Sequence, residues 1–298
     1  MELRSRIQDF VAVGIDVFAL SYDEPDALAD FRDAYDITYT LLSDPSSKVI
    51  RQFGILNTLI GEDDHPWFGI PYPGTYVVNS EGLISHKFFE NNLQLRAGPE
   101  MLLRAALGEA IEQSRTEREP PAETTWQVYL DGDRLAASVL KDLVVRIDVA
   151  GGRHLYADPA PVGNVPVALV LDEDPQIVTR DMVKPESESL TLGGTGEVIQ
   201  VYTGAVELRL PVTVNADLGV AETELREITL AGVLHWQTCD DQVCDLPRRE
   251  RFELTVPLSG IVVSELRAAA DGVLVRGMNS SKHFQRLADR RQVAGGKG

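Results

Sequence analysis

The sequence predicts two domains, an α/β domain followed by an all-β domain of the sandwich type. The chain has 298 residues, which is long for one hydrophobic core, since single domains usually contain about 100–200 residues. Helical and strand patterns alternate up to about residue 113, and beyond residue 125 short β-rich runs dominate. The composition, with 44% hydrophobic and 25% charged residues, is typical of folded globular proteins.

The first domain opens with helix, strand and helix. Apolar residues keep helical spacing from Leu3 to Val11, Gly14 ends that helix, and the apolar run at residues 15–21 predicts a buried strand. Asp23 is expected to cap a second helix that carries Pro25 in its first turn.

The rest of the first domain, which we place at residues 1–113, follows the same mixed pattern. A third helical stretch covers residues 46–53. Residues 75–78 and 83–89 predict two antiparallel strands, because the segment between them favours a tight turn. The periodic apolar positions of residues 99–113 predict a closing helix.

A polar, proline-broken stretch at residues 114–125 predicts an exposed linker. The second domain, residues 126–263, is expected to be a β-sandwich because short strand-like runs recur along it. These runs are residues 143–149, 165–171, 197–202, 206–214, 228–237 and 251–256. The tail, residues 264–298, carries little readable chemistry, and we expect a partly frayed terminus.

Charge and hydropathy exclude several classes of partner. The formal net charge of −18 would repel a phosphate backbone, so nucleic acid is not expected. No run reaches the roughly 18 apolar residues of a membrane span. The opening residues Met1 to Arg4 lack the order of a signal peptide. The chain as written would therefore stay in the cytoplasm, and a periplasmic location would need a signal further upstream.

Cys239 and Cys244 are the two cysteines of the chain, and they lie five positions apart. One such pair is no disulfide framework. A disulfide that closes so short a loop stabilises a fold by only roughly 2 kcal/mol, which is little for a protein with two large cores. Two cysteines on one turn can reach bonding distance without moving strands, so a pair that opens and closes reversibly is the better interpretation.

Local charges predict different roles for the two sulfurs. Thiol–disulfide exchange proceeds by thiolate attack, so the cysteine of lower pKa is the better entry point. Asp240-Asp241 places negative charge beside Cys239, whereas Arg248-Arg249 follows Cys244. We therefore expect Cys244 to exchange with partners and Cys239 to resolve the mixed disulfide.

Two other interpretations of the pair stay open. The first is an inert disulfide that only staples a hairpin. The second is a metal site, because His235 precedes Cys239 by four residues and aspartates follow. Extended strand geometry would place His235 and Cys239 about 13 Å apart, which argues against zinc.

The segment around the cysteines resembles the redox-active turn of the N-terminal, immunoglobulin-like domain of the thiol:disulfide interchange protein DsbD family. An aromatic strand residue, a glutamine, a small residue and the first cysteine are followed by the second cysteine and a proline. The motif reads Trp236-Gln237-Thr238-Cys239-Asp240-Asp241-Gln242-Val243-Cys244-Asp245-Leu246-Pro247.

This resemblance covers about residues 126–263 and also passes through residues 152–157, 208–215 and 255–259. It implies an immunoglobulin-like sandwich with Cys239 and Cys244 as catalytic residues. Trp236, Pro247 and Arg248 would be supporting residues. The family shields its disulfide with an aromatic-bearing cap loop, but residues 192–196 offer no aromatic before Tyr202.

Residues 1–113 resemble the later part of a peroxiredoxin or thioredoxin-like (redoxin) domain. Three stretches carry the resemblance: residues 17–23, 41–45, and 73–79 with Gly82 following. Pro73 falls where that fold places a cis-proline before a strand.

The match to the redoxin family is incomplete at its start. In that family a strand and a cysteine-bearing turn precede the first helix, but no cysteine occurs before Cys239 in this chain. We therefore expect a thioredoxin-like domain without peroxidase machinery, and an open reading frame that extends upstream through the missing elements.

These observations together predict a thiol:disulfide oxidoreductase that passes reducing equivalents between protein dithiols through Cys239 and Cys244. The chemistry requires no metal or organic cofactor. The expected partner is a thioredoxin-like or other dithiol protein, and the oligomeric state is not predicted. The alternative is a non-enzymatic interaction module with an inert disulfide and a degenerate redoxin domain.

Overall fold

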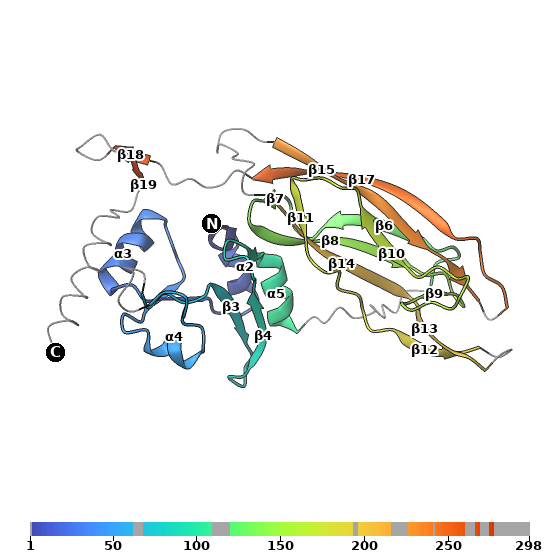
Figure 1. Cartoon of the computed structure of the whole chain (residues 1–298), viewed down its shortest axis with the longest axis horizontal. Coiled ribbons are helices and arrows are strands. Elements are labelled where there is room, and N and C mark those ends of the chain that lie inside the picture. The colour runs from blue at the N-terminus through green and yellow to red at the C-terminus, as the bar shows by residue number, and fades with distance from the viewer. Residues whose placement is uncertain are drawn as a thin grey trace. The chain divides into compact units, whose positions relative to one another are not determined.

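A computed structural model of the chain describes residues 2–61, 68–108, 120–192, 196–215, 226–240, 242–259, 266–268 and 274–276. The chain divides into two compact units, Met1–Gln94 with Val262–Gly298, and Leu95–Ile261. The described part of the first unit mixes helices and strands, and that of the second is almost entirely β (Figure 1). The predicted pairing of an α/β domain with an all-β domain is confirmed.

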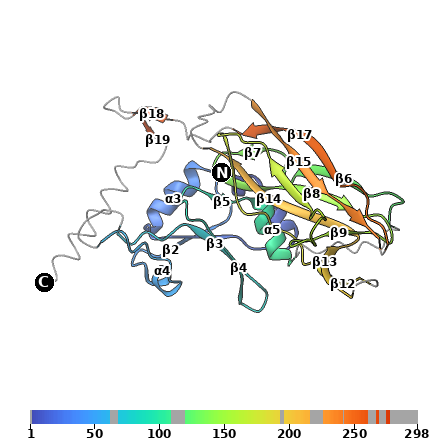
Figure 2. The same ribbon diagram turned by 45° about the vertical axis from the view of Figure 1, so that its right-hand side comes forward.

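The described residues of the first unit form three small two-stranded sheets. Strands β1 and β2 pair in parallel, and β3 and β4 form an antiparallel hairpin that is visible in teal in Figure 2. In chain order the elements before Gln94 are α1 (Glu2–Ser5), α2 (Ile7–Ala12), β1 (Phe18–Ser21), α3 (Pro25–Ala34), β2 (Thr40–Ser43), α4 (Lys48–Gln52), β3 (Gly74–Val78) and β4 (Ile84–Phe89). Farther along, β18 (Leu266–Ala268) pairs with β19 (Leu274–Arg276).

Local sequence explains the ends of these elements. The carboxamide oxygen of Asn79 accepts hydrogen bonds from the backbone N–H groups of Glu81 and Leu83, at 3.1 and 2.9 Å. Gly82 supplies the positive φ of 78° that the turn needs. The predicted hairpin is confirmed. The cap of α3, in contrast, is Glu24, because Asp23 instead accepts a hydrogen bond from the Ser21 hydroxyl.

The expectation of a cis bond before Pro73 is wrong. Among the described residues the cis peptide bond joins Asp158 to Pro159. The chain runs from a β-bridge at Pro71 directly into β3 at Gly74 without an intervening turn. The trans form, which X-Pro bonds favour by about 0.5–1 kcal/mol, accommodates this course.

The second unit contains one described helix and thirteen described strands. In chain order they are β5 (Arg96–Ala97), α5 (Pro99–Leu107), β6 (Thr125–Leu130), β7 (Leu135–Ala136), β8 (Val139–Asp148), β9 (His154–Tyr156), β10 (Ala168–Leu171), β11 (Ile177–Thr179), β12 (Glu188–Thr191), β13 (Val198–Tyr202), β14 (Ala205–Val214), β15 (Arg226–Trp236), β16 (Thr238–Cys239) and β17 (Arg248–Ser259).

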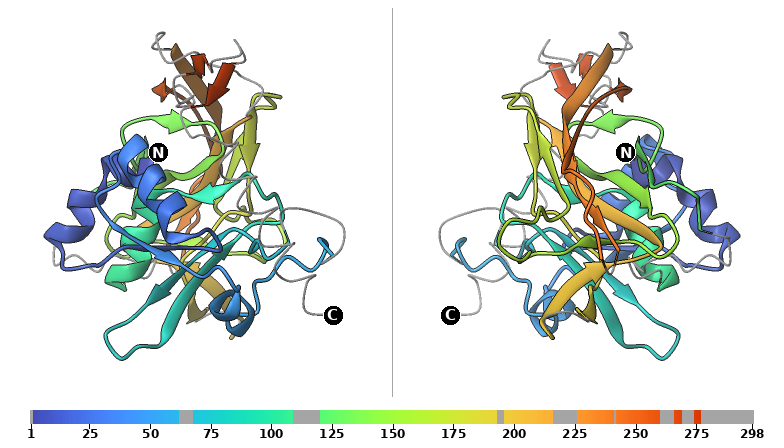
Figure 3. Two further views of the ribbon diagram at one scale, coloured as in Figure 1. Left: turned by 90° about the vertical axis from the view of Figure 1, so that its left-hand side faces the viewer. Right: turned by 90° about the vertical axis from the view of Figure 1, so that its right-hand side faces the viewer.

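These strands form a sandwich around one apolar core. One path of hydrogen-bonded strands runs β10-β15-β17-β7-β8-β14-β11, with β5 and β6 also pairing with β8, and a second sheet has the order β12-β13-β9-β16. The long strands β15 and β17 lie side by side in both views of Figure 3. Alternate apolar residues of β8, β14, β15 and β17 meet in the core, which confirms the predicted sandwich.

Helix α5 is held to the sandwich by ion pairs. Arg104 pairs with Asp131 at 2.6 Å and with Asp142, whose side chain is 2% exposed. Lys141 and Glu100, both buried, lie 3.6 Å apart. We expected this helix to belong to the first domain, but these contacts place it in the second unit. Its predicted continuation to Gln113 and the first half of the expected linker at 114–125 lie outside the described residues, so the linker stays a prediction.

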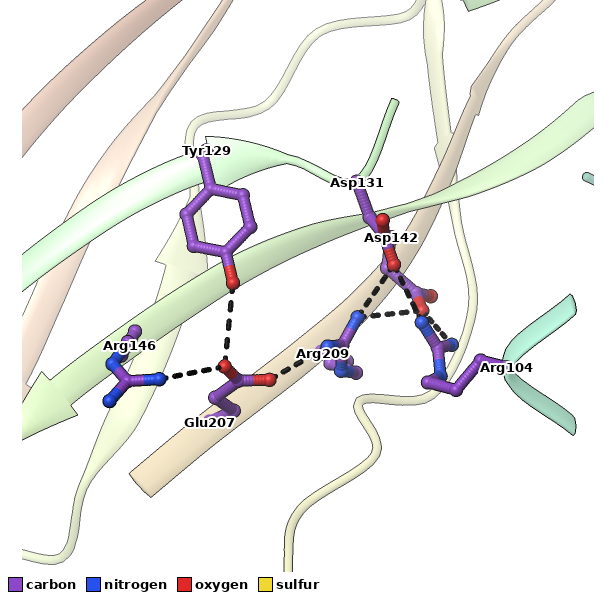
Figure 4. A network of polar contacts seen from close by, with 7 residues as sticks. All are labelled: Arg104, Tyr129, Asp131, Asp142, Arg146, Glu207 and Arg209. Carbon is purple, nitrogen blue, oxygen red and sulfur yellow. Dashed lines mark hydrogen bonds and ion pairs between the residues drawn. The ribbon is translucent and has the colours of Figure 1, made fainter. Parts of the chain in front are cut away.

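Figure 4 shows that this network of ion pairs continues to Arg209 and Glu207 of β14 and to Arg146 of β8. Arg209 pairs with Asp131 at 2.8 Å and with Glu207 at 2.7 Å. Glu207 also forms an ion pair with Arg146 at 3.5 Å. Burial opposes the charged form of Arg209, but Glu207 and Asp131 outweigh it and raise the pKa of the guanidinium. The guanidinium of Arg209 therefore stays charged.

Candidate active site

The cysteine pair lies on a short hairpin at the end of β15. Trp236 ends β15 with its side chain in the core, and the chain continues into β16, where Cys239 pairs with His154 of β9. The chain then reverses, so that Cys239 and Cys244 lie directly opposite each other and are joined by a disulfide with an S–S distance of 2.04 Å.

Hydrogen bonds hold this hairpin in addition to the disulfide. The backbone N–H of Asp240 donates to the Val243 carbonyl at 3.0 Å, and that of Asp245 donates to the Thr238 carbonyl at 2.9 Å. The Gln237 side chain donates to the Asp245 carbonyl at 2.9 Å. Opening the S–S bond would leave all three hydrogen bonds in place.

The tip of the hairpin is organised by Asp240. Its carboxylate accepts the backbone N–H groups of Gln242 and Val243, both at 2.8 Å. These two hydrogen bonds are the main reason that the pKa of Asp240 lies below its ordinary value. Asp241, which we expected to crowd Cys239, lies outside the described residues.

The two sulfur-bearing residues differ sharply in exposure. Cys239 is 1% exposed and packs against Tyr156, Ile199 and Val201, whereas Cys244 is exposed. Two aliphatic side chains near the β12–β13 hairpin, Leu190 and Leu192, also pack against this cluster. A partner thiolate can therefore approach Cys244, while Cys239 is covered.

Tyr156 is a site residue that sequence reasoning did not single out. Its hydroxyl lies 3.6 Å from the Sγ atom of Cys244. Burial, with a smaller contribution from Glu197, raises the pKa of Tyr156, so the phenol keeps its proton and can donate to sulfur. The only sequence signal was its position in the segment 152–157 that resembles the DsbD family.

Arg153 is the second residue that the sequence did not reveal. Its guanidinium donates to the Asp245 carboxylate at 2.5 Å and to the Thr238 hydroxyl at 3.4 Å, and lies 3.6 Å from the Asp240 carboxylate. The Thr238 hydroxyl donates to Asp245 as well, at 2.6 Å. One cation thus bridges the two acidic residues that follow the two cysteines.

Of the predicted supporting residues, Trp236 is buried in the core and Arg248 is exposed next to it. The Arg248 guanidinium carbon lies 5.1 Å from the centroid of the Trp236 ring, and the side chain also pairs with Glu250 at 3.9 Å. Arg248 therefore supports the buried tryptophan, and the cation hydrogen-bonded to the hairpin is Arg153. Pro247 is exposed beside the hairpin.

The metal interpretation receives no support within the described ranges, where no group of three or more His, Cys, Asp or Glu side chains is arranged to hold a metal ion. His235 lies on β15 opposite Arg249 of β17. Separately, none of the described helices is long and apolar enough to cross a membrane.

Comparisons with known proteins match each half of the chain to a different family. Residues 1–87 match the AhpC/TSA family, and residues 132–256 match the family described as thiol:disulfide interchange protein DsbD, N-terminal. The chain joins a redoxin region to a DsbD-type N-terminal domain. Both resemblances seen in the sequence are thereby confirmed.

Curated relatives of the redoxin region are peroxiredoxins. Peroxiredoxin Bcp of Escherichia coli is 29% identical over 90 residues, which are 29% of this chain and 54% of that protein. The chloroplastic peroxiredoxin Q of Gentiana triflora is 31% identical over 81 residues, which are 27% of this chain and 34% of that protein. The chain spans about half the length of the first of these relatives, so their activity is not transferred to it.

Two solved structures are similar to part of the chain. The reduced N-terminal domain of DsbD from Neisseria meningitidis is 17% identical and covers 46% of this chain and 90% of its own, with a TM-score of 0.27. The N-terminal periplasmic domain of ScsB from Proteus mirabilis is 15% identical and covers 49% and 51%, with a TM-score of 0.31. At these scores the superpositions carry no further argument.

The redoxin region, the DsbD-type domain and the Cys239–Cys244 disulfide together support thiol–disulfide redox activity in general.

Proposed function

We propose that this protein is a thiol:disulfide oxidoreductase that passes reducing equivalents between protein dithiols through Cys239 and Cys244. The observation that carries the proposal is the asymmetry of the disulfide, which joins an exposed Cys244 to a covered Cys239 on a hairpin with its own hydrogen bonds. Such a disulfide can open and close without unfolding the domain around it.

The exchange balances as two successive thiolate attacks. A thiolate of the partner dithiol attacks the Cys244 Sγ atom, the Cys239–Cys244 bond breaks, and Cys239 leaves as a thiolate. The partner's second thiolate then attacks the partner's first sulfur, which is bonded to Cys244 in the mixed disulfide, and Cys244 is released as a thiolate. The partner dithiol becomes a disulfide, and this protein gains two electrons and, on protonation of both thiolates, two protons. Reversal of these steps reduces a downstream disulfide.

The surroundings of Cys244 suit its role as the sulfur that forms the mixed disulfide. A sulfur that is attacked must be reachable, and Cys244 is exposed between the exposed side chains of Val243 and Leu246. When Cys244 is later released as a thiolate, the Tyr156 hydroxyl at 3.6 Å can donate a hydrogen bond to it. Cys239 lies directly opposite Cys244, so it can resolve the mixed disulfide without a rearrangement of the chain.

The test is to trap the mixed disulfide. The full chain with Cys239→Ala or Cys244→Ala is incubated with a thioredoxin that lacks its resolving cysteine, activated as a mixed disulfide with a chromogenic thiol. Non-reducing gels then measure the trapped complex. We expect trapping by Cys239→Ala, which retains Cys244, at least tenfold faster than by Cys244→Ala, because the remaining thiol of the latter is covered.

Two outcomes would contradict the expected result. Faster trapping through Cys239 would reverse the roles of the two sulfurs. Trapping through neither cysteine, with no measurable exchange by the wild type, would refute the proposal and favour an interaction module with an inert disulfide. The double variant without cysteines is the matched control, since any complex that it forms is not a disulfide.

A further inference from the structure

The hairpin that carries the cysteines is closed by a charge bridge as well as by backbone hydrogen bonds. Asp240 follows Cys239 and Asp245 follows Cys244, so each carboxylate lies on one side of the hairpin. Arg153, from the turn before β9, pairs with both carboxylates, at 3.6 and 2.5 Å. Two acidic side chains so placed would otherwise repel each other and push the two sides of the hairpin apart.

We propose that Arg153 is a positioning residue of the exchange reaction, which keeps Cys239 and Cys244 opposed after the disulfide is reduced. This inference rests on the proposed function and adds to it a residue, Arg153, that shifts the equilibrium between the dithiol and the disulfide. The ion-pair partners of Arg153 are carboxylates and not the reacting sulfurs. It acts through Asp240 and Asp245.

The physical consequence is a difference between the two redox states. In the oxidised protein the S–S bond itself holds Cys239 opposite Cys244, so the charge bridge adds little to their alignment. In the reduced protein only hydrogen bonds and the charge bridge hold the hairpin closed. Loss of Arg153 would widen the range of sulfur–sulfur separations, lower the effective concentration of one thiol at the other, and make the disulfide easier to reduce.

An arginine and a lysine are not equivalent at position 153, because the side chain contacts three groups at once. An arginine presents several N–H donors in a plane, and Arg153 uses them on Asp245, Thr238 and Asp240 together. A lysine at this position carries the same charge but a single donor group. Arg153→Lys should therefore recover only part of the effect of Arg153.

The experiment measures the equilibrium of the full chain with reduced and oxidised glutathione, with the redox state read by alkylation of the thiols. We expect Arg153→Ala to lower the equilibrium constant for disulfide formation about two- to fivefold, the range for partly exposed ion pairs. For a two-electron couple this raises the reduction potential by about 10–20 mV. Arg153→Lys should give an intermediate value.

The control variant is Arg251→Ala, which removes an exposed arginine paired with Asp172 at 2.7 Å in the same domain and changes the net charge equally. It should leave the equilibrium constant unchanged. A constant for Arg153→Ala equal to that of the wild type, in a protein that unfolds cooperatively, would overturn the inference, because a merely structural role moves the melting temperature and not this constant. Failure of the wild type itself to equilibrate with glutathione would instead refute the proposed function.

Discussion

Replacing Arg104 by methionine should weaken the second unit by leaving buried acidic groups without one of their cations. Arg104 is 15% exposed and links α5 to Asp131 and Asp142. Removing one partner of a buried ion pair costs about 3–5 kcal/mol. Both aspartates keep Arg209, at 2.8 and 3.6 Å, and Asp131 is 30% exposed. These two facts reduce the expected loss to about 2–3 kcal/mol.

The assay is thermal unfolding of the full chain followed by tryptophan fluorescence. Trp126 and Trp236 lie in the sandwich and pack in or against its core, so they report on the second unit. A loss of about 2–3 kcal/mol corresponds to a fall of roughly 4–12 °C in the melting temperature of a domain of this size. Arg251→Met, which breaks an exposed pair, should cost less than about 0.5 kcal/mol.

A double-mutant cycle separates the ion pair from the lost packing of the arginine stem. Asp142→Asn is combined with Arg104→Met, and the coupling energy should be at least about 1 kcal/mol, because the two side chains interact where water is largely excluded. Coupling below about 0.5 kcal/mol, or equal losses for Arg104→Met and Arg251→Met, would refute the reasoning, because the Arg104 ion pairs would then contribute little to holding α5.

Three further expectations follow from the site and the domain division. Reduction with dithiothreitol should leave the far-ultraviolet circular dichroism unchanged and lower the stability of the second unit by roughly 2 kcal/mol; loss of cooperative unfolding would contradict this. Tyr156→Phe should slow alkylation of reduced Cys244 about three- to tenfold between pH 6 and 9, because the raised pKa of Tyr156 keeps its O–H donor protonated throughout that range; an unchanged rate would exclude the hydroxyl. Limited trypsin digestion should first cut at Arg115 or Arg118 in the expected linker, and early cuts within the sandwich would contradict the domain division.

Features set by short-range sequence could be predicted. The β3–β4 hairpin follows from residues 79–82, whose side-chain hydrogen bonds and positive φ depend on neighbours within four positions. The same holds for the cysteine hairpin, in which Cys239 and Cys244 face each other across a tight reversal. The recurrence of short strand-like runs likewise predicted the sandwich, because β-rich composition and turn residues are read from each segment by itself.

Features set by long-range contacts could not be predicted. Arg104 belongs to the second unit because of carboxylates 27 and 38 positions later. Periodicity shows that a helix has an apolar face but not which core receives it. The cis bond predicted at Pro73 was wrong for a related reason, since the isomer of a proline depends on the course of the chain around it.

The sequence by itself determined that two nearby cysteines, Cys239 and Cys244, lie on one turn of a β-rich domain and are candidates for redox chemistry, because residue type and spacing are local properties. The tertiary structure decided which cysteine is exposed and which arginine forms ion pairs with the aspartates of the hairpin. Arg248 is nine or fewer positions from both cysteines but stacks on Trp236, whereas Arg153, 92 positions before Asp245, bridges the hairpin. Strand pairing of β9 with β16 brings Arg153 there, and distance along the chain carries no information about such a pairing.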